Sequence, residues 1–112
     1  MSNDLRVPRG RTLSLTVGVT DSDGTEYTLK SYEKLIFGVK LNPESTEYTI
    51  RKELTAENKV DGGYLLTLSA TELDLSVNNY KYDVALKTTD GLYDVIKCSD
   101  FEVMESVVNA DE

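Results

Sequence analysis

The chain has 112 residues, 39% of them hydrophobic and 29% charged, as expected of one folded globular domain. Its 20 Asp and Glu outnumber its 12 Lys and Arg, and the resulting formal charge of −8 opposes binding to nucleic acid or to an anionic membrane surface. With no histidine and one cysteine, Cys98, the sequence excludes Ser-His and Cys-His nucleophiles, histidine-bound zinc and an intramolecular disulfide.

Strict alternation of apolar with small or polar residues predicts the first strand, over residues 12–20. The following Asp21-Ser22-Asp23-Gly24 segment predicts a turn, because short polar side chains can bond their own backbone and glycine can adopt positive φ. A short returning strand is expected at residues 26–29. The two aspartates also resemble the start of a calcium loop, but the later bidentate glutamate is missing, so we expect no calcium requirement.

Two further strands are predicted from alternating apolar residues. The second strand ends at Asn42-Pro43, because proline cannot donate to a strand ladder. Its inward side chains are Leu35, Phe37, Val39 and Leu41. The third strand is predicted from Tyr48, Ile50 and Leu54. Lys52 interrupts the inward side of the third strand, so we expect its aliphatic stem to reach out at a sheet edge.

A turn, a fourth strand and a helical turn come next. Asp61-Gly62-Gly63 predicts the turn, and Tyr64, Leu66 and Leu68 predict the strand. Ser69 and Glu72 have the Ser-x-x-Glu spacing of a capping box, in which each side chain binds a backbone N–H at a helix start. We therefore predict one short helical turn before Asn78-Asn79.

Residues 80–95 predict a hairpin whose alternating strands are joined at Asp90-Gly91. In the last strand, Lys97 and Ser99 share a side with Tyr93 and Phe101, so the apolar alternation breaks there. A bulge or a change of sheet near Lys97 explains the break. Residues 106–112 are acidic and unpatterned, and we expect a frayed C-terminal tail.

Six or seven short strands, with turns about every ten residues, predict an all-β sandwich or a small barrel. Residues 1–105 should form this single domain. The inward side chains of its separate strands should meet in one core. That predicted core includes Leu13, Leu15, Val17, Phe37, Val39, Leu66, Tyr82, Val84, Leu86 and Phe101.

The sequence offers no catalytic, cofactor-binding or metal-ligating residue that can be assigned, and we predict a non-enzymatic protein without a cofactor. Phosphate-loop, CxxC and HExxH motifs are absent from it. Cys98 alternates within a strand beside Asp100, so we interpret it as a core or sheet-face cysteine. Four tyrosines fall at inward positions, namely Tyr64, Tyr80, Tyr82 and Tyr93. Three others are candidates for a surface that binds protein or carbohydrate: Tyr27, Tyr32 and Tyr48.

Several motifs in order along the chain resemble the N-terminal domain of phage baseplate upper proteins. The N-terminal part of the resemblance consists of Arg9-Gly10, the alternating residues 12–20, the Asp21-Ser22-Asp23-Gly24 turn and Leu68-Ser69 with its helical turn. The C-terminal part consists of Tyr80-x-Tyr82-Asp83-Val84, Asp90-Gly91-x-Tyr93-x-Val95 and Phe101-Glu102-Val103. The chain departs from the family pattern at Arg11 and at Cys98-Ser99.

The resemblance implies an all-β, antiparallel, immunoglobulin-like sandwich of about seven strands, used as a structural module of a phage or prophage virion. Such a module would dock on other tail or baseplate proteins, with self-association left open. The N-terminus, Met1-Ser2-Asn3-Asp4, lacks the features of a signal peptide, so we expect synthesis in the bacterial cytoplasm followed by virion association. The alternatives are a bacterial adhesin-type module that binds carbohydrate through exposed tyrosines, and a fragment of a larger protein. Lys52 and Lys97 would mark sheet edges, either for docking or as protection against aggregation.

Overall fold

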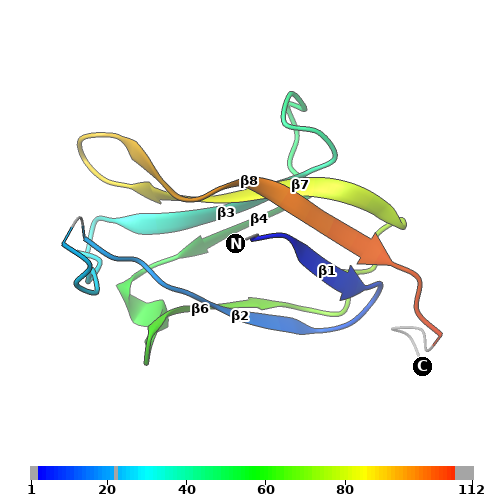
Figure 1. The fold of residues 1–112 in the computed structure, drawn as a ribbon, viewed down its shortest axis with the longest axis horizontal. Helices are drawn as coiled ribbons and strands as arrows, with labels where there is room; N and C mark the ends of the chain where they lie inside the picture. The colour runs from blue at the N-terminus through cyan, green and yellow to red at the C-terminus, as the bar shows by residue number, and fades with distance from the viewer. Residues whose placement is uncertain (1–2, 22, 108–112) are drawn as a thin grey trace.

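Two β-sheets lie face to face in the computed structural model, which describes residues 3–21 and 23–107 (Figure 1). One sheet has the strand order β1 (Leu5–Pro8), β8 (Leu92–Met104), β7 (Asn78–Lys87), β3 (Lys34–Lys40) and β4 (Ile50–Leu54). The other has the order β2 (Leu13–Val17), β6 (Gly63–Leu68) and β5 (Lys59–Val60). A short 3-10 helix, η1 (Ala56–Asn58), precedes β5.

The strand order is that of an immunoglobulin-like sandwich. β8, β7, β3 and β4 correspond to strands G, F, C and C′ of such a domain, and β2, β6 and β5 correspond to B, E and D. The predicted all-β, immunoglobulin-like sandwich is therefore confirmed. The described part of the chain has eight strands rather than about seven, and one of its pairings, β1 with β8, is parallel rather than antiparallel.

β1 has no counterpart among the predicted strands. This strand has only four residues, ends in a proline, and pairs with residues 96 positions further on, as Arg6 and Glu102 illustrate. Val7 is nevertheless buried in the core, and the Arg9 N–H donates to the carbonyl of Met104 at 2.8 Å. A short strand held by a distant partner leaves little local pattern to detect.

One core cluster joins the two sheets. Three of its rings pack together, with centroid separations of 5.6 Å for Phe37 and Tyr82, 6.3 Å for Phe37 and Phe101, and 6.0 Å for Tyr82 and Phe101. The predicted core residues that are buried are Val17, Phe37, Val39, Leu66, Tyr82, Val84 and Phe101. The remaining three, Leu13, Leu15 and Leu86, are half-buried and pack against this cluster.

A loop takes the place of two predicted strand segments between β2 and β3; its described residues are 18–21 and 23–33. The first strand ends at Val17, and the expected strand at residues 26–29 is wrong, because only one bridge joins Thr20 to Glu26. The buried carboxylate of Glu33 explains the loop: it accepts bonds from the Tyr27 hydroxyl at 2.7 and 2.8 Å and from the Lys30 N–H at 3.0 Å. Side-chain acceptors thus replace a strand ladder here.

Three apolar positions differ from the prediction in environment or in strand assignment. Leu41 is exposed, because the Asn42 side chain accepts the Glu44 N–H at 2.8 Å and turns the chain out of β3. Tyr48 precedes β4 instead of starting it, and it is exposed, as expected of a candidate surface tyrosine. Tyr93 lies at an inward register position, opposite Leu86, but is 53% exposed. The end of the β7–β8 hairpin projects past the strands of the smaller sheet (Figure 1), and Tyr93 is the second residue of β8 after this hairpin end.

The predicted turns are confirmed, with one addition. The Ser69 and Glu72 side chains make the reciprocal capping-box bonds, at 3.1 and 2.9 Å, around a single hydrogen-bonded turn that does not extend into a helix. The η1 turn, with its own capping box between Thr55 and Asn58, was not predicted. Thr88 and Gly91 close the predicted hairpin through an N–H to carbonyl bond of 2.9 Å. Ser22, and residues 108–112 of the expected C-terminal tail, lie outside the described residues.

Candidate functional site

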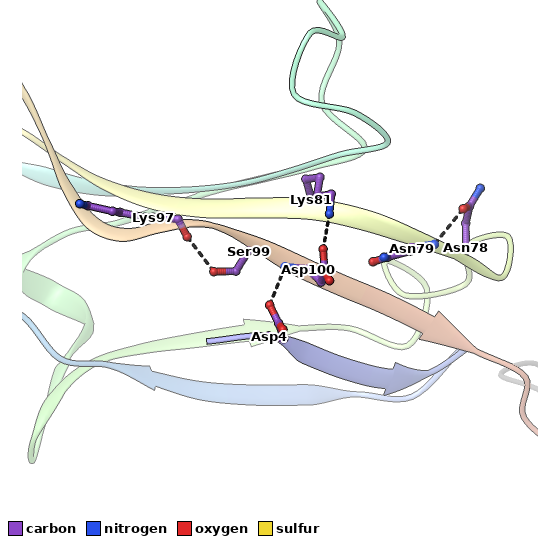
Figure 2. Close-up of polar contacts among 7 residues, drawn as sticks. All are labelled: Asp4, Asn78, Asn79, Lys81, Lys97, Ser99 and Asp100. Carbon is purple, nitrogen blue, oxygen red and sulfur yellow. Dashed lines mark hydrogen bonds and ion pairs between the residues drawn. The ribbon is translucent and has the colours of Figure 1, made fainter. Parts of the chain in front are cut away.

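The outer edge of β8 is paired with another strand along only part of its length. Residues Phe101 to Met104 pair with β1, starting with Phe101 opposite Leu5. Before Phe101, the strand pairings of the described chain place only β7 beside β8. Where the β1 pairing stops, the Asp4 side chain accepts the Asp100 N–H at 2.9 Å, as Figure 2 shows. A side chain therefore replaces the strand neighbour at this point. Among the described residues no strand pairs with residues 92–99 of β8 on this side, and we call this stretch the free edge of β8.

The free edge contains the bulge predicted near Lys97. Tyr82 of β7 lies opposite Ser99, whereas Val84 lies opposite Ile96. Between these two pairs β8 therefore contains one residue more than β7. The Ser99 hydroxyl donates to the Lys97 carbonyl at 2.8 Å within the bulge (Figure 2). A second extra residue of β8 lies between Ile96, opposite Val84, and Asp94, opposite Ala85. The two irregularities together account for the break in apolar alternation, and Lys97 itself is exposed.

An ion pair lies on the outer face beside this edge. The Lys81 ammonium of β7 binds the Asp100 carboxylate of β8 directly across the strand pair (Figure 2). This hydrogen bond, rather than burial, raises the pKa of Lys81. Both side chains are partly exposed, so the pair fixes local side-chain positions and contributes little to stability.

An apolar hollow of about 250 Å³ opens between the two sheets next to the free edge. Side chains from both sheets line it, including Leu5, Leu15, Phe37, Leu66, Val84 and Ile96. Of these, Leu5, Leu15 and Ile96 are only half-buried. Asn3 and Asp4 also border the hollow, and the Tyr82 hydroxyl donates to the Asn3 carbonyl. Among the described residues, the core is therefore incompletely covered on the side of β2 and of the part of β8 that β1 does not reach.

An ion pair joins β4 to the turn after β6 on the opposite side of the sandwich. Lys52, on the outermost strand β4, lies at an inward register position opposite Phe37, and its ammonium is 2.7 Å from a Glu72 carboxylate oxygen. Glu72 belongs to the capping-box turn after β6, and its bond to Lys52 lowers its pKa. The prediction that Lys52 and Lys97 mark sheet edges is confirmed for both residues. Their surroundings differ, however, because only the β4 side is bridged in this way.

A smaller hollow, of about 120 Å³, lies on the outer face of the larger sheet. The Tyr48 ring covers Gly38, at which a Cβ would come within 2.5 Å of the ring, and the Lys40 ammonium is 4.7 Å from the ring centroid. Asp83 and the exposed Cys98 also line this hollow. Burial, followed by the charge of Asp94, raises the pKa of Asp83. Cys98 is therefore the sheet-face cysteine that was one of the two predicted environments.

The candidate surface tyrosines do not gather into one patch. Tyr27 is half-buried, and its hydrogen bond to Glu33, with burial and the Glu33 charge, raises its pKa to about 12. Burial alone would raise the pKa of Glu33, but the Lys30 N–H, the Tyr27 hydroxyl and the Lys30 charge together lower it. Tyr32 precedes β3, whereas Tyr48 covers its second half. Tyr27 and Glu33 thus organise the loop of residues 18–33.

Asp21 and Gly24 are joined by a hydrogen bond, as the predicted turn requires. The Gly24 N–H donates to the Asp21 carbonyl at 2.9 Å, and Gly24 has a φ of 87°. The Asp23 carboxylate accepts the Thr25 N–H at 3.0 Å, which lowers the Asp23 pKa. Among the residues that the structure describes, no group of three or more Asp, Glu, Cys or His side chains could hold a metal ion.

Comparisons with protein-family models, with curated proteins and with solved structures give no match to this chain. Within residues 3–21 and 23–107, no helix is long and apolar enough to cross a membrane. The feature that distinguishes this surface is the free edge of β8 beside a partly open apolar core.

Proposed function

We propose that this domain is a non-enzymatic structural module of a phage or prophage tail or baseplate, which docks on other virion proteins. The free edge of β8 carries the docking part of the proposal. An unpaired edge presents backbone N–H and C=O groups that another protein chain can pair with, and half-buried apolar side chains lie next to it. After synthesis in the bacterial cytoplasm, the domain would then become part of the virion.

The resemblance to phage baseplate upper proteins supports the virion setting. It implies an immunoglobulin-like sandwich, and the fold agrees with that expectation. Several motif residues have structural roles in this fold: the Gly10 N–H donates to the Leu73 carbonyl at 2.8 Å, and Tyr82 and Phe101 pack in the core. A docking module needs no catalytic group, which agrees with a sequence that lacks histidine.

Co-expression with the proteins encoded beside this chain tests the proposal. We expect at least one tail or baseplate protein among them to co-elute with the domain in size-exclusion chromatography, with a defined stoichiometry by light scattering. A strictly monomeric domain that co-elutes with none of these proteins would contradict the proposal.

Carbohydrate binding is the second candidate function, and the hollow around Tyr48 favours it. An exposed aromatic ring beside Lys40 and Asp83 combines apolar area with polar groups, as sugar recognition requires. If this function is correct, the domain should be retained on a glycan array, and Tyr48→Ala should abolish retention. Tyr32→Ala, at an exposed tyrosine outside the hollow, is the matched control.

A further inference from the structure

β4 is an edge strand of the larger sheet, and its three central residues are all charged. Among the described strands only β3 pairs with it, so one side of its backbone faces away from the sheet. Arg51, Lys52 and Glu53 lie between two buried apolar residues, Ile50 and Leu54. An edge strand presents unpaired N–H and C=O groups that can pair with a strand of another molecule, and proteins usually prevent this pairing through the side chains of the edge itself.

Lys52 is the charged residue of β4 that points inward. It lies opposite Phe37, which is in the core, and between Ile50 and Leu54, which are both buried. Its ammonium lies 2.7 Å from a carboxylate oxygen of Glu72, on the capping-box turn after β6. The Lys52 and Glu72 side chains are 33% and 32% exposed, so both charges keep contact with water. The inward row of this edge strand therefore ends in a hydrated ion pair at its middle position.

Stability alone does not account for a lysine at this position. An ion pair whose partners are each about one-third exposed contributes little to stability. An apolar side chain opposite Phe37 would instead bury apolar area, which is the main favourable contribution to folding. Replacing a partly buried ion pair by apolar residues of similar size is often neutral or stabilising. Lys52 thus stands where an apolar residue would stabilise the fold at least as well.

The same charges oppose the addition of another strand to the sheet. A strand paired with the outer edge of β4 would place its inward residues beside Lys52. Apolar residues there would remove water from the ammonium and from Glu72, at a cost in free energy. On the outer face the incoming strand would meet Arg51 and Glu53, which bind each other at 2.7 Å, and Glu53 also binds Lys34 at 2.9 Å. The three charges of β4 are therefore already paired within the domain.

We propose that Lys52, held in place by Glu72, protects the β4 edge against strand pairing with a second copy of this chain. A lysine at a sheet edge can serve either docking or protection against aggregation, and Lys52 has the second role. This role does not depend on the proposed docking function, which uses the free edge of β8. Strand pairing of this domain with other molecules is thereby kept away from β4.

Removal of the charge tests the role of Lys52. Lys52→Met keeps an unbranched side chain of similar length, and Lys81→Met is the matched control. Lys81 lies in the same sheet, binds the Asp100 carboxylate and is 38% exposed, but its strand, β7, has a neighbour on each side. In analytical ultracentrifugation we expect Lys52→Met to self-associate at concentrations lower by about tenfold or more than the parent protein. Lys81→Met should behave as the parent does.

Two further measurements separate edge pairing from other effects. Lys52→Met should melt at or above the temperature of the parent protein, because the ion pair is not there for stability. Hydrogen exchange of the backbone amides in residues 50–54 should slow when Lys52→Met self-associates, while exchange in residues 92–99, on the other side of the sheet, should not change. The double variant Lys52→Met with Glu72→Gln, which removes both charges, should self-associate in the same way.

Three results would overturn the proposal. The first is a Lys52→Met protein that is as monomeric as the parent. The second is equal self-association of Lys52→Met and Lys81→Met, which would show that any lost charge on this sheet has the same effect. The third is a melting temperature several degrees lower in both the single and the double variant, which would assign the ion pair to stability. If the single variant alone is destabilised, the unpaired Glu72 is the cause, and self-association of the double variant decides. These measurements involve no virion protein, so their outcome is separate from that of the proposed function.

Discussion

Alanine at Gly63 should destabilise the domain strongly, because this glycine lies against the backbone of another strand. Gly63 is the first residue of β6, beside the end of β2. A Cβ there would lie 2.3 Å from the carbonyl oxygen of Val17 and 2.8 Å from its carbonyl carbon. The φ of Gly63 is 157°, a value that residues with a side chain rarely adopt.

Both effects add to the cost of the substitution. An unfavourable backbone conformation costs about 1 to 3 kcal/mol. Overpacking costs about 1 to 3 kcal/mol more, since Val17 is held by its pairing with Tyr64 and cannot move aside as a flexible side chain could. We therefore expect Gly63→Ala to lower the free energy of unfolding by about 3 to 5 kcal/mol, a large part of the roughly 5 to 15 kcal/mol of a typical domain.

Two neighbouring glycines separate these effects. Gly62 has a φ of 89° but nothing within 4 Å of its Cβ position, so Gly62→Ala should cost about 1 kcal/mol from conformation alone. At Gly18 the Cβ would make an ordinary 3.6 Å contact, and the change should stay within about 0.5 kcal/mol. Urea unfolding followed by far-UV circular dichroism measures all three. If Gly63→Ala costs no more than Gly62→Ala, the reasoning from the Val17 contact is wrong.

Three more predictions concern burial and pH. Val84→Ala, at a side chain that is 1% exposed, should cost about 2 kcal/mol in urea unfolding, whereas Val77→Ala, at 44% exposure, should be nearly neutral. Because the fold lowers the pKa of Glu33, the ionised carboxylate stabilises the domain fully above its unfolded-state pKa, and this stabilisation is lost as pH falls through the folded-state pKa. Glu33→Gln should therefore flatten the acid dependence of the melting temperature. The pKa of Tyr27 is raised to about 12, so its neutral hydroxyl stabilises the fold fully below about pH 10, and this stabilisation is lost as pH rises toward 12. Tyr27→Phe should flatten the alkaline dependence of the melting temperature. If that dependence is unchanged in the variant, the Tyr27–Glu33 hydrogen bond is contradicted.

Local alternation was a sound guide where a strand has one buried face along its whole length. Phe37, Val84 and Phe101 are buried where the period of two places them. The period does not show where the opposing sheet ends, however. Tyr93 keeps its inward register position but lies beyond the cover of the other sheet, so its ring is exposed. The exposure of a side chain at a strand end depends on the relative lengths of the two sheets. The sequence of one strand does not predict this difference in length.

The loop of residues 18–33 shows a second limit. Its sequence alternates well enough to predict a strand. In the structure, however, the carboxylate of Glu33 accepts hydrogen bonds from the Tyr27 hydroxyl and the Lys30 N–H and holds this segment as a loop. The Tyr64 hydroxyl adds a bond from the Leu29 N–H at 2.7 Å, across 35 residues. These partners satisfy the loop backbone without a neighbouring strand, and their meeting depends on the tertiary fold.

The sequence predicts where the sheet edges lie but not which edge lacks a neighbour. Two lysines with similar sequence surroundings, Lys52 and Lys97, show the difference. Lys52 and Lys97 both interrupt an apolar alternation. Lys52 lies on the edge strand β4, and Lys97 lies on the part of β8 that β1 does not cover. Lys52 closes its side of the sandwich by reaching Glu72, a residue of the turn after β6. Lys97 lies in a strand of 13 residues whose partner, β1, has only four, so most of that edge has no neighbour among the described strands. A break in alternation therefore identifies an edge, but the length of the strand beside it decides whether the edge is closed or open to a partner.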